Sequence, residues 1–164
     1  MATVKGFLAE LKQESASTKK ILERVPLDKT TWKPHEKSMT LGRLATHIAE
    51  NSQWISRIIK TDEIDFSKMD FKKNVADNTE ELLAIFQSHL DAAITDLEKT
   101  EDEELEDIWT VRHGDSILFE LPKKVAIRSW AFSHTFHHRG QLSVYLRLLD
   151  IPVPGIYGPS ADEN

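Results

Sequence analysis

Apolar residues recur at intervals of three and four along four long segments of the chain, and this periodicity limits the fold more than any other feature. Such spacing places apolar side chains on one face of an α-helix, and that face must be buried against other helices. The segments cover residues 4–25, 40–60, 78–97 and 122–150. The pattern therefore predicts an all-α protein built as a four-helix bundle.

Residues that begin or end helices lie at the edges of these segments. Thr40 is a good N-cap for the second helix, and Asn78 with Glu81 resembles a capping box at the start of the third. Pro26 ends the first helix, and Pro122 suits the first turn of the fourth. Polar loops are expected between the first three helices.

The segment DIWTVRHGDSILFELP, residues 107–122, has a different character. Short β-prone stretches flank the turn-forming residues His113, Gly114 and Asp115, so we expect a short hairpin or an ordered crossover before the last helix. Pro152 and Pro154 forbid continuation of that helix. The tail should be extended and lie back over the bundle.

Length and composition limit the class of protein. The 164 residues suffice for one buried core, so we expect a single domain over residues 1–164. A net charge of −6 argues against a nucleic-acid partner. The absence of cysteine excludes thiolate ligands. No stretch approaches the ~18 apolar residues of a membrane span, and the N-terminus lacks a signal peptide, so we expect a cytoplasmic protein without a membrane partner.

Three of the seven histidines fall within the stretch SHTFHHRGQ of the fourth expected helix. At ~100° per residue, His134 and His138 lie about 40° apart on one face, an arrangement that lets two imidazoles meet one metal ion. The same face carries Trp130 and Gln141, so it is largely an interior face. Two histidines therefore occupy positions where leucine would be expected.

A third imidazole is available from the second expected helix. His47 precedes Trp54 and Ile58 by seven and eleven residues, so it points inward or along the edge of the apolar stripe. Three unpaired imidazoles in a core would cost ~1–3 kcal/mol each, whereas one divalent ion satisfies a nitrogen of each. The alternative is a set of ordinary hydrogen-bonded core histidines, and the spacing alone leaves the two interpretations about equal.

Three further polar residues have open roles. His137 is expected to be exposed or to support a ligand, although a rotation of the helix would let it replace His134 or His138. His89 is expected to be a packed histidine, with contact to the site as the less favoured alternative. Glu50 is a candidate general base or a carboxylate that supports a ligand, and the alternative is a solvated helix charge.

Three stretches resemble one known family. The stretches LGRLATHIAENSQWI, HTFHHRGQLSVYLRLL and IPVPGIYGPSADE, which begin at residues 41, 134 and 151, are similar to the DinB/YfiT-like family of metal-dependent enzymes. The resemblance implies an up-down-down-up four-helix bundle, often a homodimer, with a three-histidine metal site. By motif position, the ligands are His47, His134 and His138. Arg139, Gly140 and Gln141 would support them, with Gly140 permitting close helix contact and Gln141 orienting a ligand or a metal-bound water.

The resemblance also implies a class of chemistry. Three neutral imidazoles leave a divalent ion with an open coordination position; zinc or nickel is favoured, and iron, cobalt or manganese is compatible. A water or thiol at that position ionises near neutral pH, so we expect a hydrolase of small molecules or a transferase that uses a low-molecular-weight thiol. A non-catalytic bundle, in which the ion stabilises the fold or a dimer, is the alternative, and a fourth protein ligand would favour it.

Overall fold

The first expected helix is present as α1, Thr3–Leu22, in a computed structural model that describes residues 3–70 and 74–163. The apolar side chains of α1 at helical spacing are buried, among them Phe7 and Leu11. Its N-terminus is capped from far along the chain. The carboxylate of Asp102 accepts hydrogen bonds from the backbone N–H groups of Thr3 and Val4, at 3.0 and 2.8 Å.

The second expected helix is divided into α2, Leu41–Glu50, and α3, Gln53–Lys60. Thr40 is its N-cap, as predicted, and accepts from the backbone N–H of Arg43 at 3.3 Å. The expectation of one continuous helix over residues 40–60 was wrong, because the chain makes a tight turn at residues 51–52. Backbone bonds of the i to i+3 type, from Asn51 to Ile48 and from Trp54 to Asn51, replace the α-helical pattern there.

The third expected helix is α4, Thr79–Glu98. Asn78 caps it and accepts from the backbone N–H of Glu81 at 2.9 Å. The reciprocal bond of a capping box is displaced by one residue, because the Glu81 carboxylate accepts from the backbone N–H of Asp77. The predicted start of this helix is therefore confirmed.

The fourth expected helix is also irregular. It consists of α5, Lys123–Ile127, a π-helical segment, Arg128–Ser133, and α6, His134–Leu148. A uniform helix over residues 122–150 was expected, and the π segment corrects that expectation. A π segment inserts the equivalent of one extra residue into a turn. The spacing of apolar residues therefore predicts the helix but not this local widening.

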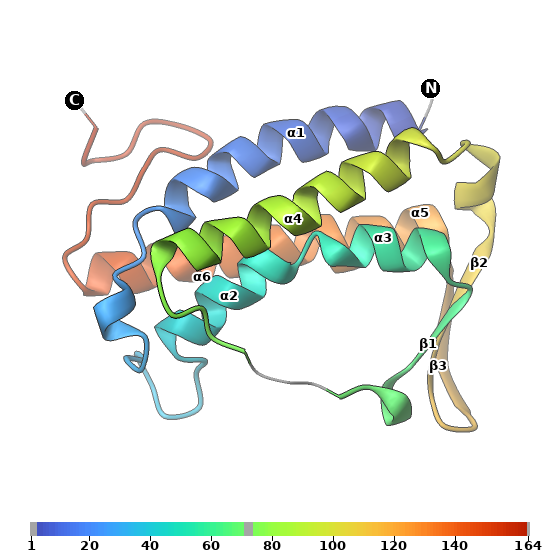
Figure 1. Ribbon diagram of the computed structural model, residues 1–164, viewed down its shortest axis with the longest axis horizontal. Helices are drawn as coiled ribbons and strands as arrows, with labels where there is room; N and C mark the ends of the chain where they lie inside the picture. Colours follow the sequence, from blue (N-terminus) through green and yellow to red (C-terminus); the bar gives the residue numbers. More distant parts are fainter. Residues whose placement is uncertain (1–2, 71–73, 164) are drawn as a thin grey trace.

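The order of the helices is up-down-down-up (Figure 1). In the described residues the helices form four rods: α1, α2 with α3, α4, and α5 with α6. The rods α2–α3 and α4 run in the same direction, and the crossover between them includes β1, Glu63–Asp65, and a 3-10 turn, Phe66–Lys68. None of the described helices is both long enough and apolar enough to cross a membrane.

A small three-stranded mixed sheet closes one end of the bundle (Figure 1). The strands β2, Ile108–His113, and β3, Ser116–Pro122, form the predicted antiparallel hairpin, and β1 pairs with β2 in parallel. The fold is therefore mainly helical, and the expected all-α class is corrected by the small mixed sheet, of which the sequence predicted only the hairpin. Strand β1 is three residues long, too short to show the alternation that identifies a strand.

Candidate metal centre

Three imidazoles from two rods converge on one point. His47 comes from the last part of α2, and His134 and His138 come from successive turns of α6. The Nε2 atom of His134 lies 3.1 Å from Nε2 of His47 and 2.7 Å from Nε2 of His138. One nitrogen of each ring lies within 4.8 Å of the other two, so the three residues could hold one metal ion.

A hydrogen bond fixes the orientation of the His138 ring. Its Nδ1 atom lies 2.8 Å from Oε1 of Gln141, which can only accept, so Nδ1 carries the proton and Nε2 presents its lone pair. The amide nitrogen of Gln141 lies 3.0 Å from Nε2 of the exposed His137. Gln141 thus connects His137 to His138, and His137 itself lies outside the three-histidine group.

The backbone before α6 is irregular next to His134. In a regular α-helix the carbonyl of Trp130 would accept from the backbone N–H of residue 134. Here that N–H donates to the carbonyl of Ala131 instead. Burial is the main cause that lowers the pKa of His134, and the backbone of Trp130 opposes this shift. Nε2 of the His134 ring faces His47 and His138.

The close approach of the imidazoles gives a cation a point at which to bind. Because Gln141 holds the proton of His138 on Nδ1, the Nε2 lone pair of His138 faces Nε2 of His134 across 2.7 Å. Two nitrogens bound tetrahedrally to one zinc ion at 2.0–2.1 Å would be about 3.3 Å apart. A small separation of the rings would therefore admit an ion, and the donor set fits a divalent metal.

The surroundings keep the three imidazoles neutral. Burial is the main cause that lowers the pKa of His47 from 6.5 to about 4, and the nearby His138, His134 and Arg43 lower it further in the same direction. Burial also lowers the pKa values of His134 and His138. Neutral imidazole is the form that binds metals, so all three rings are available as ligands at neutral pH.

The candidate base Glu50 is linked to His47 through Arg43, which lies on the Nδ1 side of the imidazole. Its carboxylate accepts from the guanidinium of Arg43 at 3.0 Å, and the same guanidinium lies 3.4 Å from Nδ1 of His47. His89 is outside the three-histidine group; burial lowers its pKa, and the negative charge of Glu50 opposes this shift. The proposed role of Glu50 as a base stays a prediction.

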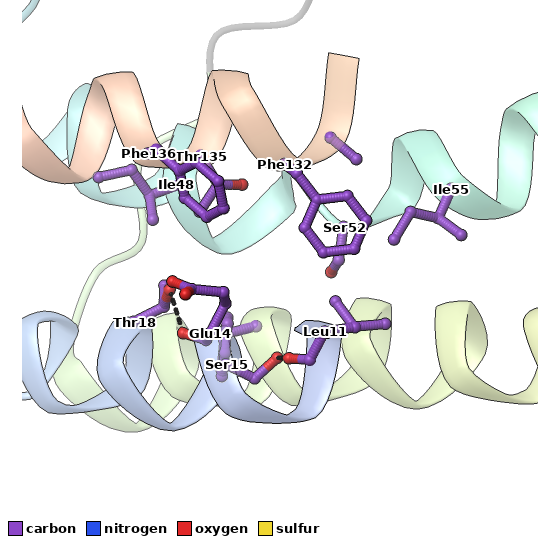
Figure 2. A pocket seen from close by; sticks show the side chains of 12 residues that line it. Leu11, Glu14, Ser15, Thr18, Ile48, Ser52, Ile55, Phe132, Thr135 and Phe136 are labelled. Atoms are coloured by element: carbon purple, nitrogen blue, oxygen red, sulfur yellow. Dashed lines mark hydrogen bonds between the residues drawn. The ribbon is translucent and has the colours of Figure 1, made fainter. Parts of the chain in front are cut away.

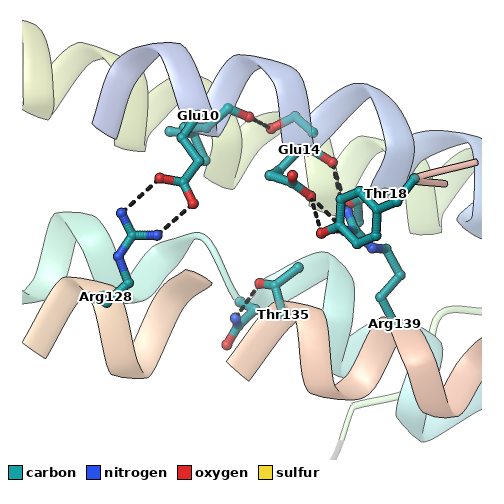
Figure 3. A network of polar contacts seen from close by, with 10 residues as sticks. Glu10, Glu14, Thr18, Arg128, Thr135 and Arg139 are labelled. Atoms are coloured by element: carbon teal, nitrogen blue, oxygen red, sulfur yellow. Dashed lines mark hydrogen bonds and ion pairs between the residues drawn. The ribbon is translucent and has the colours of Figure 1, made fainter. Parts of the chain in front are cut away.

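Arg139, one of the expected supporting residues, connects two rods. Its guanidinium is 3% exposed and donates to the carboxylate of Glu14 at 2.5 Å and to the hydroxyl of Thr18 at 3.0 Å (Figure 3). It also donates to the hydroxyl of Tyr157, and this contact holds the C-terminal tail against the bundle. The close helix contact expected at Gly140 does not occur among the described residues, since a Cβ built there would meet no atom within 4 Å.

A cavity of about 30 Å³ lies between α1, the break in the second rod and α6 (Figure 2). Its lining is mostly apolar and includes Leu11, Ile55, Phe132 and Phe136, together with the hydroxyl-bearing Ser52. A cavity needs at least about 10–15 Å³ of solvent-accessible volume to hold one water molecule. This cavity is therefore too small for a substrate, and the histidine cluster remains the candidate functional site.

Two polar residues of the site region were missed from the sequence. Arg43 precedes His47 by one turn, and this i, i+4 spacing could have indicated their contact. Asn51 is 1% exposed and donates to the carbonyl of Ala131 and the hydroxyl of Thr135. Asn51 could have been identified as a buried polar residue, because it lies between Ile48 and Ile55, where the apolar stripe of the second rod predicts an apolar residue.

Comparisons with known proteins agree with this architecture. The chain is 26% identical to the uncharacterized protein YrdA of Bacillus subtilis over 165 residues, which cover 98% of this chain and 92% of that protein. A crystal structure of a DinB-like protein from Bacillus cereus matches with a TM-score of 0.72 and 23% identity over 93% of this chain and 97% of that one. The DinB-like protein YjoA of Bacillus subtilis matches with a TM-score of 0.71 and 19% identity, over 94% and 99%.

The family assignment covers the whole sequence. The model of the DinB family matches residues 1–164. The chain therefore belongs to the DinB family.

Proposed function

For this member of the DinB family we propose a metal-dependent enzyme that acts on a small molecule and binds one divalent ion through His47, His134 and His138. The observation that carries the proposal is the convergence of three Nε2 atoms at 2.7 and 3.1 Å, from positions 87 residues apart in the sequence. Gln141 holds the Nδ1 proton of His138. The lone pair on Nε2 of His138 is thereby aimed at the point of convergence before any ion binds.

The donor set limits the identity of the ion. Three imidazoles without a thiolate suit zinc or nickel, and iron, cobalt or manganese is compatible. Hydrogen bonds to the remaining ring nitrogens raise the basicity of ligating histidines and fix their orientation. We therefore assign Gln141 to ligand orientation rather than to contact with the substrate.

An open coordination position supports a catalytic role. Within residues 3–70 and 74–163, no carboxylate or further histidine joins the three ligands. A divalent ion with three protein ligands supplies Lewis acidity and makes a water or a thiol more acidic. The protein's own contribution is to keep the three rings neutral by burial and to hold their geometry.

The reaction that we propose is the hydrolysis of a small molecule or the transfer of a low-molecular-weight thiol to an electrophile. Both reactions need a nucleophile generated at neutral pH, which is what such a site supplies. We further propose that the protein acts as a homodimer. The competing hypothesis is an ion that only stabilises the bundle or the dimer.

Metal analysis of variants tests the site. The purified protein is loaded with zinc or nickel, desalted and analysed by inductively coupled plasma mass spectrometry. We expect one equivalent in the wild type and in His137→Ala, the matched control, and a loss of metal in His134→Ala/His138→Ala. Equal metal content in the wild type and the double variant would falsify the metal site.

A substrate panel tests the catalytic role. Esters, amides and thiol-plus-electrophile pairs are assayed at full metal occupancy, with the double variant as the blank. Turnover that requires the metal supports the enzyme. Failure of every pair, together with a metal-dependent rise in thermal stability, would favour the non-catalytic alternative.

A further inference from the structure

Asn51 lies where the second rod is irregular. It is 1% exposed and stands at the tight turn between α2 and α3. Its own backbone N–H donates to the carbonyl of Ile48, and its carbonyl accepts from Trp54, both over three residues. The turn is wound more tightly than an α-helix at this position.

The side chain of Asn51 reaches the irregular part of the fourth rod. Its Nδ2 atom donates to the carbonyl of Ala131 at 2.8 Å and to the hydroxyl of Thr135 at 2.6 Å. Ala131 belongs to the π segment, and Thr135 lies in the first turn of α6. A tightened turn in one rod therefore faces a widened turn in the other, and one buried amide joins them.

Both contacts of this amide flank a metal ligand. His134 lies three residues after Ala131 and directly before Thr135, and His47 lies one helical turn before Asn51. The backbone N–H of His134 donates to the carbonyl of Ala131, the same carbonyl that accepts from Asn51. Asn51 thus holds the backbone from which the His134 side chain extends.

We propose that Asn51 is a positioning residue of the metal centre: its amide locks the π segment against the break in the second rod and so sets the orientation of His134 and its distance from His47. The inference rests on the proposed function, since it assigns a role toward the ion that those histidines would bind. It goes beyond the three ligands, because the side chain of Asn51 hydrogen-bonds Ala131 and Thr135 rather than a ligand.

The chemistry of the contact requires an amide. Both partners accept from Nδ2, which has two protons to donate. Aspartate has the same shape but no donor, and its charge would face the carbonyl oxygen of Ala131. Asn51→Asp therefore removes the donor to the Ala131 carbonyl while it keeps the volume, and Asn51→Ala removes the whole contact and the volume together.

Cobalt binding provides the first test. Co²⁺ affinity is measured by chelator competition, and the visible absorption bands report the coordination geometry. We expect Asn51→Asp and Asn51→Ala to bind Co²⁺ about 10- to 100-fold more weakly than the wild type and with changed bands. The matched control is Thr61→Val, which removes the 3.1 Å hydrogen bond from Trp109 to Thr61 at the other end of the second rod. Its affinity and bands should stay those of the wild type.

Two results of this test would overturn the proposal. One is wild-type affinity and bands in both Asn51 variants. The other is an equal loss in Thr61→Val, because the effect would then follow general stability. Should Asn51→Asp fail to fold, Thr135→Val serves in its place, since it removes one of the two acceptors, and Thr135→Ser should restore the wild-type affinity.

A metal-free measurement separates this proposal from the proposed function. The nitrogen-15 shifts of the His134 ring report which nitrogen carries the proton. We expect one dominant form in the wild type and a changed proportion of the two forms in Asn51→Asp. If the wild type binds no metal, the proposed function fails, and this measurement alone decides the positioning role: an unchanged proportion in the variant would refute it.

Discussion

The amide oxygen of Gln141 lies 2.8 Å from Nδ1 of His138, on the next turn of α6. Because this contact holds the Nδ1 proton, Gln141→Leu should weaken Zn²⁺ affinity about 10- to 100-fold. Gln141→Glu keeps an acceptor and should bind at least as tightly as the wild type. Chelator competition measures both. Tight binding by Gln141→Leu would show that the ring needs no such support.

Arg43 should oppose metal binding. A guanidinium can only donate, so its 3.4 Å contact makes Nδ1 of His47 an acceptor and leaves the proton on Nε2, the atom that faces the site. Arg43→Met should therefore bind Zn²⁺ about fivefold more tightly, the equivalent of one hydrogen bond. It also frees the Glu50 carboxylate to accept from Nδ1, so Arg43→Met/Glu50→Gln should lose part of the gain. Weaker binding in Arg43→Met would contradict the assignment.

The metal-free protein should lose stability as the pH falls below the ordinary pKa of a histidine. The pKa of His47 is about 4 in the folded protein and 6.5 in the unfolded chain, so the unfolded chain binds more protons between these values. The free energy of unfolding should therefore rise with pH through this window and level off above it. Urea titrations between about pH 4.5 and 7.5 measure the slope. His47→Gln should show a smaller slope, and an identical slope would refute the assignment.

The buried ion pair between Arg139 and Glu14 should contribute more to the free energy of unfolding than the hydrogen bond from Tyr157 to Glu14. Glu14→Ala leaves the guanidinium of Arg139 buried without its carboxylate, which typically costs about 3–5 kcal/mol. Tyr157→Phe removes a hydroxyl that donates to Glu14 at 2.9 Å, and a loss of about 1 kcal/mol is expected. Urea unfolding of the two variants compares them. A smaller loss for Glu14→Ala would show that the pair is hydrated in solution.

The sequence alone identified features that depend on neighbours in the chain. The caps at Thr40 and Asn78 follow from side-chain oxygens placed before apolar stripes, and the hairpin follows from the turn at His113–Asp115. The pairing of His134 with His138 follows from the pitch of a helix. These features are confirmed because each depends on interactions within a few residues.

Tertiary contacts decided the features that give the candidate site its geometry. The turn at Asn51 and the π segment are joined by a bond between residues 80 apart, and His47 meets His134 across 87 residues. The spacing of apolar residues indicates a helix of constant pitch. It therefore does not show that a turn of one rod is wound more tightly where the facing turn of the other rod is wound more widely. The residues of the candidate metal centre could be named from their spacing and family resemblance. Their convergence on one point depends on contacts that form only when the two rods pack together.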